Sequence, residues 1–267
     1  MAKIKVAVAG PRGRMGSEAV KMIIKDTEHL EFVCGIDPKY AGGDVGVTIG
    51  IGEIGAPFVS DLREALAIHK PDVLVDLTTP HVVKQNMRVA IEMGVRPVVG
   101  TTGFTPEDIE ELDKLCHANN VGAIIAPNFA IGAVLMMRFA QEAAKYMPHV
   151  EIIEQHHDQK LDAPSGTAVK TAEMIQAVRE ELRQGHPDEK ETIDGARGGY
   201  YGGFRIHSVR LPGLVAHQEV IFGAVGQTLT IRHDSINRES FMPGINLSVK
   251  KVMEYTGLVY GLENIMF

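Results

Sequence analysis

The stretch Glu154–Ala168 holds the densest set of residues in this chain that could carry acid–base chemistry. Two imidazoles, an ammonium and carboxylates stand close together in it, and a Ser-Gly-Thr turn at 165–167 follows them. A strand-like run at 150–155 precedes the charged residues, and a helical pattern from Thr167 to Arg183 follows. The first backbone N–H groups of a helix have no partner within the helix, so they suit an anion. We therefore expect a place that holds a carboxylate and moves a proton beside it.

Two other interpretations of this stretch stay open at this point. A metal-dependent hydrolase would use His156, His157 and Asp162, although neighbouring residues on a strand point to opposite faces, so the imidazoles could share a metal only beyond the strand's end. We predict no metal site. A nucleotide sensor without catalysis would be expected to lack the His-His-x-x-Lys pattern, which is intact here. Taken singly, these residues also suit a solvated loop with Ser165 as a helix cap.

A glycine-rich turn near the start of the chain indicates nucleotide binding. It follows a buried-strand pattern at 4–9 and precedes a helical stretch from Ser17 to about Lys25. A second strand-like run ends at Asp37, 21 residues after Gly16, where a dinucleotide fold places the carboxylate that bonds the ribose. Glycines let backbone N–H groups approach a pyrophosphate. The expected cofactor contacts here are Gly10, Pro11, Arg12, Gly13, Arg14, Met15 and Asp37.

The charges near this acid do not decide between NADH and NADPH. Asp37 favours NADH because a carboxylate repels the 2′-phosphate of NADPH. Arg12, Arg14 and Lys39 stand close enough in the sequence to offset that repulsion. We therefore predict that the cofactor is NADH or NADPH.

Strand and helix patterns alternate from residue 61 to residue 126. Such alternation predicts a parallel sheet with helices on both faces, and ligands bind beyond the carboxyl ends of its strands. Small polar residues such as Thr78 and Thr79 follow several of these ends. Further candidate nicotinamide and ribose contacts are Gly100, Thr101, Thr102, Ala126, Pro127, Asn128 and Phe129.

The pattern changes after Asn128. We expect a helix from about Ile131 to Tyr146, then the stretch described above, and then a glycine-rich flexible segment at 194–203. Three strand-like runs follow, at 204–210, 215–224 and 227–233. With the run at 150–155 they predict a mixed four-stranded sheet with one covered face. A helix broken near Pro243 then returns to the first domain.

The expected fold is therefore α/β. A Rossmann-like doubly wound parallel sheet at 1–128 and 238–267 would bind the dinucleotide. An inserted α+β domain at 129–237 would bind the substrate and form oligomers, because an open sheet face invites self-association.

The composition of the chain limits the kinds of partner that it can bind. The chain has 267 residues and a formal charge of −7, which argues against a nucleic-acid surface but not against a small anionic substrate in a cleft. No apolar run approaches the length of a membrane span, so we expect no membrane partner. Cys34 and Cys116 match no metal spacing and suit reduced thiols, which favours a cytoplasmic protein.

Four motifs together resemble the bacterial dihydrodipicolinate reductase family. They are Gly10–Gly16, Gly100–Gly103, Asn128-Phe129 and Glu154–Ala168, and the resemblance extends in order along nearly the whole chain. It implies a nicotinamide-dependent reductase of the lysine and diaminopimelate pathway that acts on 4-hydroxy-tetrahydrodipicolinate. It also implies a homotetramer built through the second-domain sheets, often accepting either NADH or NADPH.

The resemblance also implies roles for single residues. His156 would be the general acid/base, and Lys160 its partner as proton donor and a contact for the substrate. The other substrate-carboxylate contacts would be His157, Ser165, Gly166 and Thr167. In some members of the family an arginine comes directly after the acid that corresponds to Asp37, whereas Pro38-Lys39 follows Asp37 in this chain. A related reductase or dehydrogenase of another small dicarboxylate is the alternative.

Overall fold

The computed structural model describes residues 2–180 and 182–267, and the chain forms two compact units. They are Met1–Phe129 with Arg238–Phe267, and Ala130–Asn237. The first boundary falls one residue later than expected, because Phe129 packs within the first unit. Its side chain is buried, its ring lies against Gly100 and its carbonyl group lies against Gly244.

The first unit is built on a sheet in which all strand pairs are parallel. Within the described chain the sheet has seven strands in the order β12-β6-β5-β4-β1-β2-β3. The strands are β1 (Ile4–Ala9), β2 (Leu30–Ile36), β3 (Phe58–Val59), β4 (Val73–Asp76), β5 (Arg96–Val99), β6 (Gly122–Ile125) and β12 (Gly257–Tyr260). Because β1 lies between β2 and β4, the winding direction reverses there, which is where such folds bind dinucleotides.

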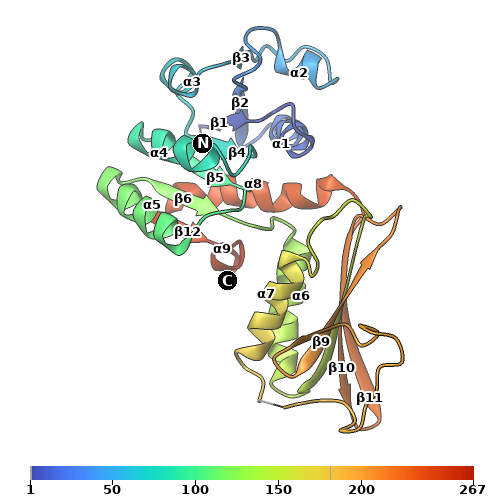
Figure 1. Ribbon diagram of the computed structural model, residues 1–267. Coiled ribbons are helices and arrows are strands. Elements are labelled where there is room, and N and C mark those ends of the chain that lie inside the picture. The colour runs from blue at the N-terminus through green and yellow to red at the C-terminus, as the bar shows by residue number, and fades with distance from the viewer. Residues whose placement is uncertain (1, 181) are drawn as a thin grey trace. The chain divides into compact units, whose positions relative to one another are not determined.

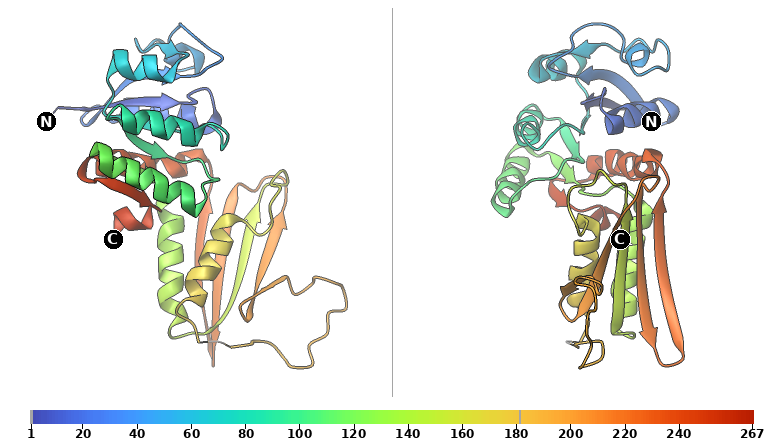
Figure 2. Two further views of the ribbon diagram at one scale, coloured as in Figure 1. Left: turned by 60° about the vertical axis from the view of Figure 1, so that its left-hand side comes forward. Right: turned by 45° about the vertical axis from the view of Figure 1, so that its right-hand side comes forward.

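Helices cover both faces of this sheet (Figures 1 and 2). One face carries α1 (Arg14–Lys25) and α8 (Met242–Lys251), which contact each other. The other face carries α3 (Leu62–His69), α4 (Val83–Glu92) and α5 (Pro106–Asn119). The remaining elements are short: α2 (Val45–Thr48), η1 (Arg238–Phe241), η2 (Val252–Glu254) and α9 (Glu263–Met266). The doubly wound Rossmann-like fold expected from the alternating pattern is confirmed.

Three details of the first unit differ from expectation. Helix α1 begins at Arg14, three residues before Ser17, so the last glycine of the turn lies inside it. Pro243 does not break a helix, because it occupies the first turn of α8, where a missing N–H removes no helical hydrogen bond. Strand β12, which is only four residues long, was not expected.

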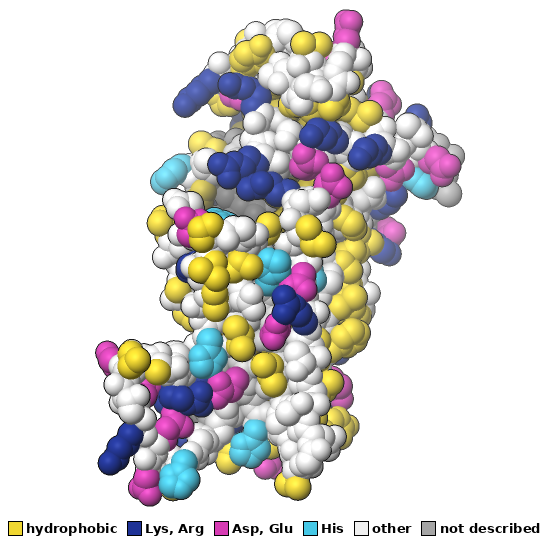
Figure 3. All heavy atoms as spheres, turned by 90° about the vertical axis from the view of Figure 1, so that its right-hand side faces the viewer, with side chains coloured by type: hydrophobic (Ala, Val, Ile, Leu, Met, Phe, Trp, Pro, Cys, Tyr) yellow, Lys and Arg dark blue, Asp and Glu magenta, His cyan; other side chains and the backbone are white. Residues whose placement is uncertain are grey.

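The second unit is a mixed sheet with helices on one face. Its strands are β7 (His149–His156), β8 (Gly199–Tyr201), β9 (Phe204–Arg210), β10 (Ala216–Ala224) and β11 (Gln227–Ser235), in the order β11-β10-β7-β9-β8. Only the β7–β9 pair is parallel. Helices α6 (Ile131–Ala144) and α7 (Gly166–Gln176) lie side by side on one face (Figures 1 and 2). The sheet residues Ile152 and Phe222 are fully buried. The other face mixes charged, histidine and apolar side chains (Figure 3).

The expected strand count and helix length were wrong in this unit. The sheet has a fifth strand, β8, which lies inside the segment expected to be flexible and pairs with β9 through a turn at Gly202 and Gly203, both with positive φ. Helix α7 ends at Gln176 rather than Arg183. Beyond it the Arg179 guanidinium donates to the carbonyl oxygens of Pro148, Gly202 and Leu182, and these bonds hold the chain in a non-helical path.

None of the helices in the described residues combines the length and the apolar character that a membrane span requires.

Candidate active site

The expected cofactor contacts gather at one edge of the first unit. Because all its strands run in the same direction, the residues that follow β1, β2, β5 and β6 lie at the same edge. Gly10 has φ +79°, and a Cβ at Gly16 would overlap the Gly10 carbonyl oxygen, so this turn requires glycine at both positions. No side chain caps α1 at Gly13, which leaves N–H groups of its first turn for an anion. The turn therefore fits a pyrophosphate.

Asp37 and Arg12, expected to favour different cofactors, are neighbours. The Asp37 carboxylate accepts a hydrogen bond from the Lys39 backbone N–H at 3.0 Å and lies 3.5 Å from Arg12 Nη1. The Arg12 guanidinium also lies over the Tyr40 ring, 5.0 Å from its centroid. A cation thus stands directly beside the acid that follows β2.

The ends of β5 and β6 pack closely together. A Cβ at Gly100 would come within 2.7 Å of the Leu77 side chain and 2.9 Å of the Phe129 ring, so only glycine fits there without rearrangement. The remaining candidates divide by exposure. Thr102 and Pro127 are exposed, Asn128 and Met15 are half-buried, and Thr101 and Ala126 are buried.

Asp76, at the end of β4, belongs to this edge and was missed by the sequence analysis. Its buried carboxylate accepts hydrogen bonds from the Thr78 N–H at 3.0 Å, the Thr78 hydroxyl at 2.5 Å and the Asn86 amide at 2.8 Å. Burial raises the pKa of Asp76, although these hydrogen bonds act to lower it. The carboxylate fixes the loop that follows β4, and its signal in the sequence was an acid ending an otherwise apolar strand.

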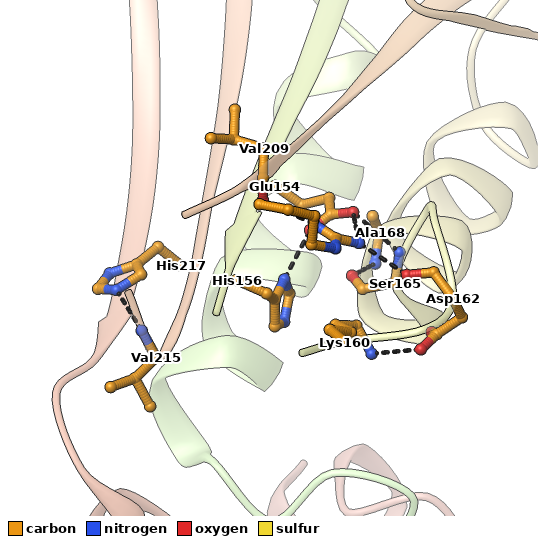
Figure 4. Close-up of polar contacts among 10 residues, drawn as sticks. Glu154, His156, Lys160, Asp162, Ser165, Ala168, Val209, Val215 and His217 are labelled. Carbon is orange, nitrogen blue, oxygen red and sulfur yellow. Dashed lines mark hydrogen bonds and ion pairs between the residues drawn. The ribbon is translucent and has the colours of Figure 1, made fainter. Parts of the chain in front are cut away.

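The acid–base residues lie in the second unit, at the end of β7. His156 is the last residue of that strand, and its Nδ1 lies 2.6 Å from Oε2 of Glu154 (Figure 4). The two side chains meet because residues two apart on a strand share a face. Glu154 is fully buried, whereas the His156 side chain keeps 15% of its surface exposed.

Arg210, the last residue of β9, completes this cluster. It stands opposite His156 in the parallel register, and its guanidinium donates to both carboxylate oxygens of Glu154, at 2.7 and 2.9 Å. Burial raises the pKa of Glu154, but hydrogen bonds from His156 and Arg210 outweigh it and bring the pKa to about 2. Glu154 is therefore a carboxylate at neutral pH, and Nδ1 of His156 is the hydrogen-bond donor.

The loop between β7 and α7 is fastened to the same carboxylate. The Ser165 N–H donates to Oε1 of Glu154 at 3.2 Å, and the Ser165 hydroxyl accepts from the Ala168 N–H, so it caps α7. Arg210 also donates to the Asp162 carbonyl oxygen at 2.7 Å. Lys160 Nζ lies 2.8 Å from the Asp162 carboxylate, and Figure 4 shows the His156 ring between Glu154 and Lys160.

The other expected substrate contacts surround this loop. His157 lies beyond the end of β7 and is exposed. Gly166 is exposed as well, and a Cβ there would meet no atom within 4 Å, so the first turn of α7 is open. Thr167 is half-buried.

The hydrolase interpretation finds little support in these contacts. The carboxylate of Asp162, its third expected ligand, is paired with Lys160. Across the residues that the structure describes, no three His, Cys, Asp or Glu side chains are grouped as a metal site would require. The cluster is arranged to orient an imidazole.

Comparison with known proteins assigns the chain to a family. The model described as "Dihydrodipicolinate reductase, N-terminus" matches residues 4–129, and the one described as "Dihydrodipicolinate reductase, C-terminus" matches residues 132–266. The chain belongs to the dihydrodipicolinate reductase family. The resemblance inferred from the motifs is thereby confirmed, and so is the expected class of enzyme, an oxidoreductase that uses a nicotinamide cofactor.

Individual members of this reductase family match this chain over nearly their whole length. The 4-hydroxy-tetrahydrodipicolinate reductases of Geobacillus thermodenitrificans and Halalkalibacterium halodurans are 60% and 62% identical, and each match covers 98% of this chain and 99% of the relative. The dipicolinate-bound dihydrodipicolinate reductase from Paenisporosarcina sp. TG-14 is 52% identical with a TM-score of 0.88, over 99% of this chain and 100% of that one. An amine dehydrogenase from Mycobacterium smegmatis, 17% identical with a TM-score of 0.69 over 97% of this chain and 95% of that one, shares the fold alone.

Proposed function

We propose that this protein reduces 4-hydroxy-tetrahydrodipicolinate to tetrahydrodipicolinate in lysine and diaminopimelate biosynthesis, with His156 as the proton donor. The observation that carries the proposal is the His156 imidazole held by a buried carboxylate, in the stretch that also supplies Lys160 and the open start of α7. Whole-length relatives with that reductase activity in their names support the choice of substrate.

The 4-hydroxyl group of the substrate is absent from the product, so one water has to leave, formed from that hydroxyl and a hydrogen of the neighbouring carbon. The conjugated cyclic imine that results is reduced by a hydride placed on one carbon and a proton placed on its neighbour, and a bound nicotinamide would supply the hydride. With Nδ1 of His156 donating to Glu154, the proton for the substrate leaves from Nε2. Lys160 assists as the second proton donor.

The two carboxylates of the substrate need positive charge and N–H donors. Lys160, His157 and the Ser165–Thr167 turn at the start of α7 supply them. Because Lys160 is paired with Asp162, a substrate carboxylate has to compete with Asp162 for the ammonium group.

We propose that the cofactor binds at the strand ends of the first unit and that the protein accepts both NADH and NADPH. Gly10–Met15 would contact the pyrophosphate, Asp37 and Arg12 the adenosine ribose, and Gly100–Thr102 with Ala126–Phe129 the nicotinamide half. The protein acts in the cytoplasm as a homotetramer joined through the sheets of its second unit. We propose no nucleic-acid partner.

Steady-state oxidation of NADH and of NADPH tests this function directly. The substrate is hydroxy-tetrahydrodipicolinate, generated enzymatically in the assay, and pyridine-2,6-dicarboxylate serves as an unreactive competitor. Turnover with at least one cofactor is expected. No turnover with either one overturns the proposal, and turnover only with another small dicarboxylate imine points to the related-reductase alternative.

A further inference from the structure

Among the residues that the structure describes, groups that can donate a hydrogen bond surround both carboxylate oxygens of Glu154, and the Ser208 side chain is one of them. His156 Nδ1 and Arg210 Nη1 reach Oε2 at 2.6 and 2.9 Å, while the Ser165 N–H and Arg210 Nη2 reach Oε1 at 3.2 and 2.7 Å. The carboxylate is fully buried, so these donors occupy both oxygens in place of water.

This arrangement selects one form of the imidazole. An ionised carboxylate only accepts hydrogen bonds, so the neutral His156 ring keeps its hydrogen on Nδ1 and presents a lone pair at Nε2. The charged ring carries its second proton on Nε2, which is then the proton to be released. Arg210 fixes the carboxylate from the far side and bonds the Asp162 carbonyl oxygen, which ties the loop bearing Lys160 to the same group.

We infer that Glu154 is a positioning residue, which holds His156 in the tautomer that can transfer a proton from Nε2 and anchors the substrate loop through Ser165. This inference rests on the proposed role of His156. Glu154 itself, being buried, acts only through the imidazole and the loop.

Glu154→Gln separates these two roles. The amide oxygen can remain toward Ser165 and Arg210 Nη2, which places the NH₂ group against His156. Nδ1 then becomes an acceptor and the ring hydrogen moves to Nε2, while Arg210 Nη1 keeps its bond to the Val209 carbonyl oxygen at 2.8 Å. We expect kcat to fall about 10²–10⁴-fold with the substrate KM within a few-fold, since a wrong tautomer costs about 10⁴ in a Ser–His–Asp triad.

A spectroscopic reading of the tautomer accompanies the kinetics. In protein labelled with ¹⁵N-histidine, the ring signal that disappears in His156→Gln identifies His156. Nδ1–H with an unprotonated Nε2 is expected for the neutral ring of the wild type, and the reverse for Glu154→Gln. A purely structural role for Glu154 would not exchange the two nitrogens.

Glu151→Gln is the matched control. Glu151 lies on the opposite face of β7 and also accepts from an arginine and lies beside an imidazole, Arg197 at 2.5 Å and His207 at 2.6 Å. Its replacement should leave kcat and the His156 signals unchanged.

A second variant keeps the inference testable if Glu154→Gln does not fold. Glu154→Gln alone weakens the pairing of a largely buried Arg210, so Glu154→Gln/Arg210→Gln removes both charges, and its kcat should fall to a similar extent. Folded variants with kcat near the wild-type value, or a wild-type His156 with its hydrogen on Nε2, overturn the inference while the reductase activity stands. A near-normal kcat in His156→Gln instead removes the proposed role of His156, and the inference with it.

Discussion

The imidazole of His156 has one nitrogen bound to Glu154 and one left for chemistry. Its position at the end of β7 places it where a regular strand gives way to the loop that carries Lys160. The loop, in turn, is fastened to the carboxylate that orients the ring. Binding and proton transfer thus depend on neighbouring residues whose contributions kinetic measurements can separate.

His156→Gln should lower kcat about 10²–10⁴-fold and leave the substrate KM within a few-fold, because a positioned acid acts in the transition state. The measurement is steady-state kinetics with NADH. His207→Gln is the matched control, since His207 also lies 2.6 Å from a strand carboxylate, that of Glu151. A His156→Gln enzyme with near-normal kcat would leave His156 a structural histidine.

Lys160→Ala should worsen both kcat and KM. An ammonium that pairs with a substrate carboxylate contributes to ground-state binding as well as to catalysis. Nucleotide affinity, measured by fluorescence titration of NADH, should stay unchanged, because the expected nucleotide contacts lie in the other unit. Lys170→Ala, an exposed position on α7, is the control. A change in kcat alone would argue against a carboxylate-binding role for Lys160.

The pair formed by Asp37 and Arg12 should balance the two cofactors. We expect the dissociation constants for NADH and NADPH to differ by less than about a hundredfold, roughly 2.7 kcal/mol. Arg12→Ala removes the cation that lies 3.5 Å from the acid, so it should weaken NADPH more than NADH. Fluorescence titrations of both cofactors decide this. A strong preference in the wild type would show that one of the two charges dominates.

At the scale of elements, much of the architecture could be predicted from hydrophobic patterns and turns. The alternation of strands and helices predicted the parallel sheet, and the runs that became β9 and β10 were placed to within a residue. Strand β8 was missed because it lies in a glycine-rich segment, and β12 because it stands outside the region in which strands and helices alternate. Their pairing comes from contacts distant in the sequence.

Some contacts within the candidate site also follow from the sequence. The spacing of Glu154 and His156 already places both side chains on one face of a strand, so their contact could have been inferred. The role of Arg210 could not, because it stands 56 residues after Glu154 and meets it only through the register of β7 with β9. Register of this kind depends on packing across the whole sheet.

Because Glu154 joins β7, α7 and β9, it should also make stability depend on pH. Its pKa in the folded protein is about 2, below the ordinary 4.5, so the ionised group stabilises the fold above about pH 4.5 and this stabilisation is lost as the pH falls toward 2. The difference in unfolding free energy between the wild type and Glu154→Gln should therefore shrink as the pH is lowered across that window.

Urea unfolding followed by circular dichroism at fixed protein concentration measures this difference. The control is Glu110→Gln, which removes an exposed ion pair with Lys114 and should change stability little at any pH. A wild-type advantage that stays constant from pH 6 to pH 3 would contradict a stabilising, ionised Glu154.

For the whole molecule, the second unit has one sheet face under α6 and α7 and one without helices. On the face without helices, Ile153 stands between His207 of β9 and Glu219 of β10 and is half-buried. Ion pairs such as Arg232 with Glu219 satisfy charges within this face. A face of paired charges around apolar side chains suits contact with a second copy of itself, because little unpaired charge would be desolvated.

A self-complementary face joins two copies, and the homotetramer proposed above would have a mass four times the 29.0 kDa of one chain. Analytical ultracentrifugation measures that mass. Ile153→Glu should shift it toward smaller species, because an interface through this face would bury an unpaired carboxylate. Ile68→Glu introduces the same change at a position on α3 of the first unit that is 63% exposed, and it should leave the mass unchanged. A monomeric wild type would contradict the expected assembly. A tetramer that tolerates Ile153→Glu would place its interfaces elsewhere, since a single buried charge costs more than most protein contacts can offset.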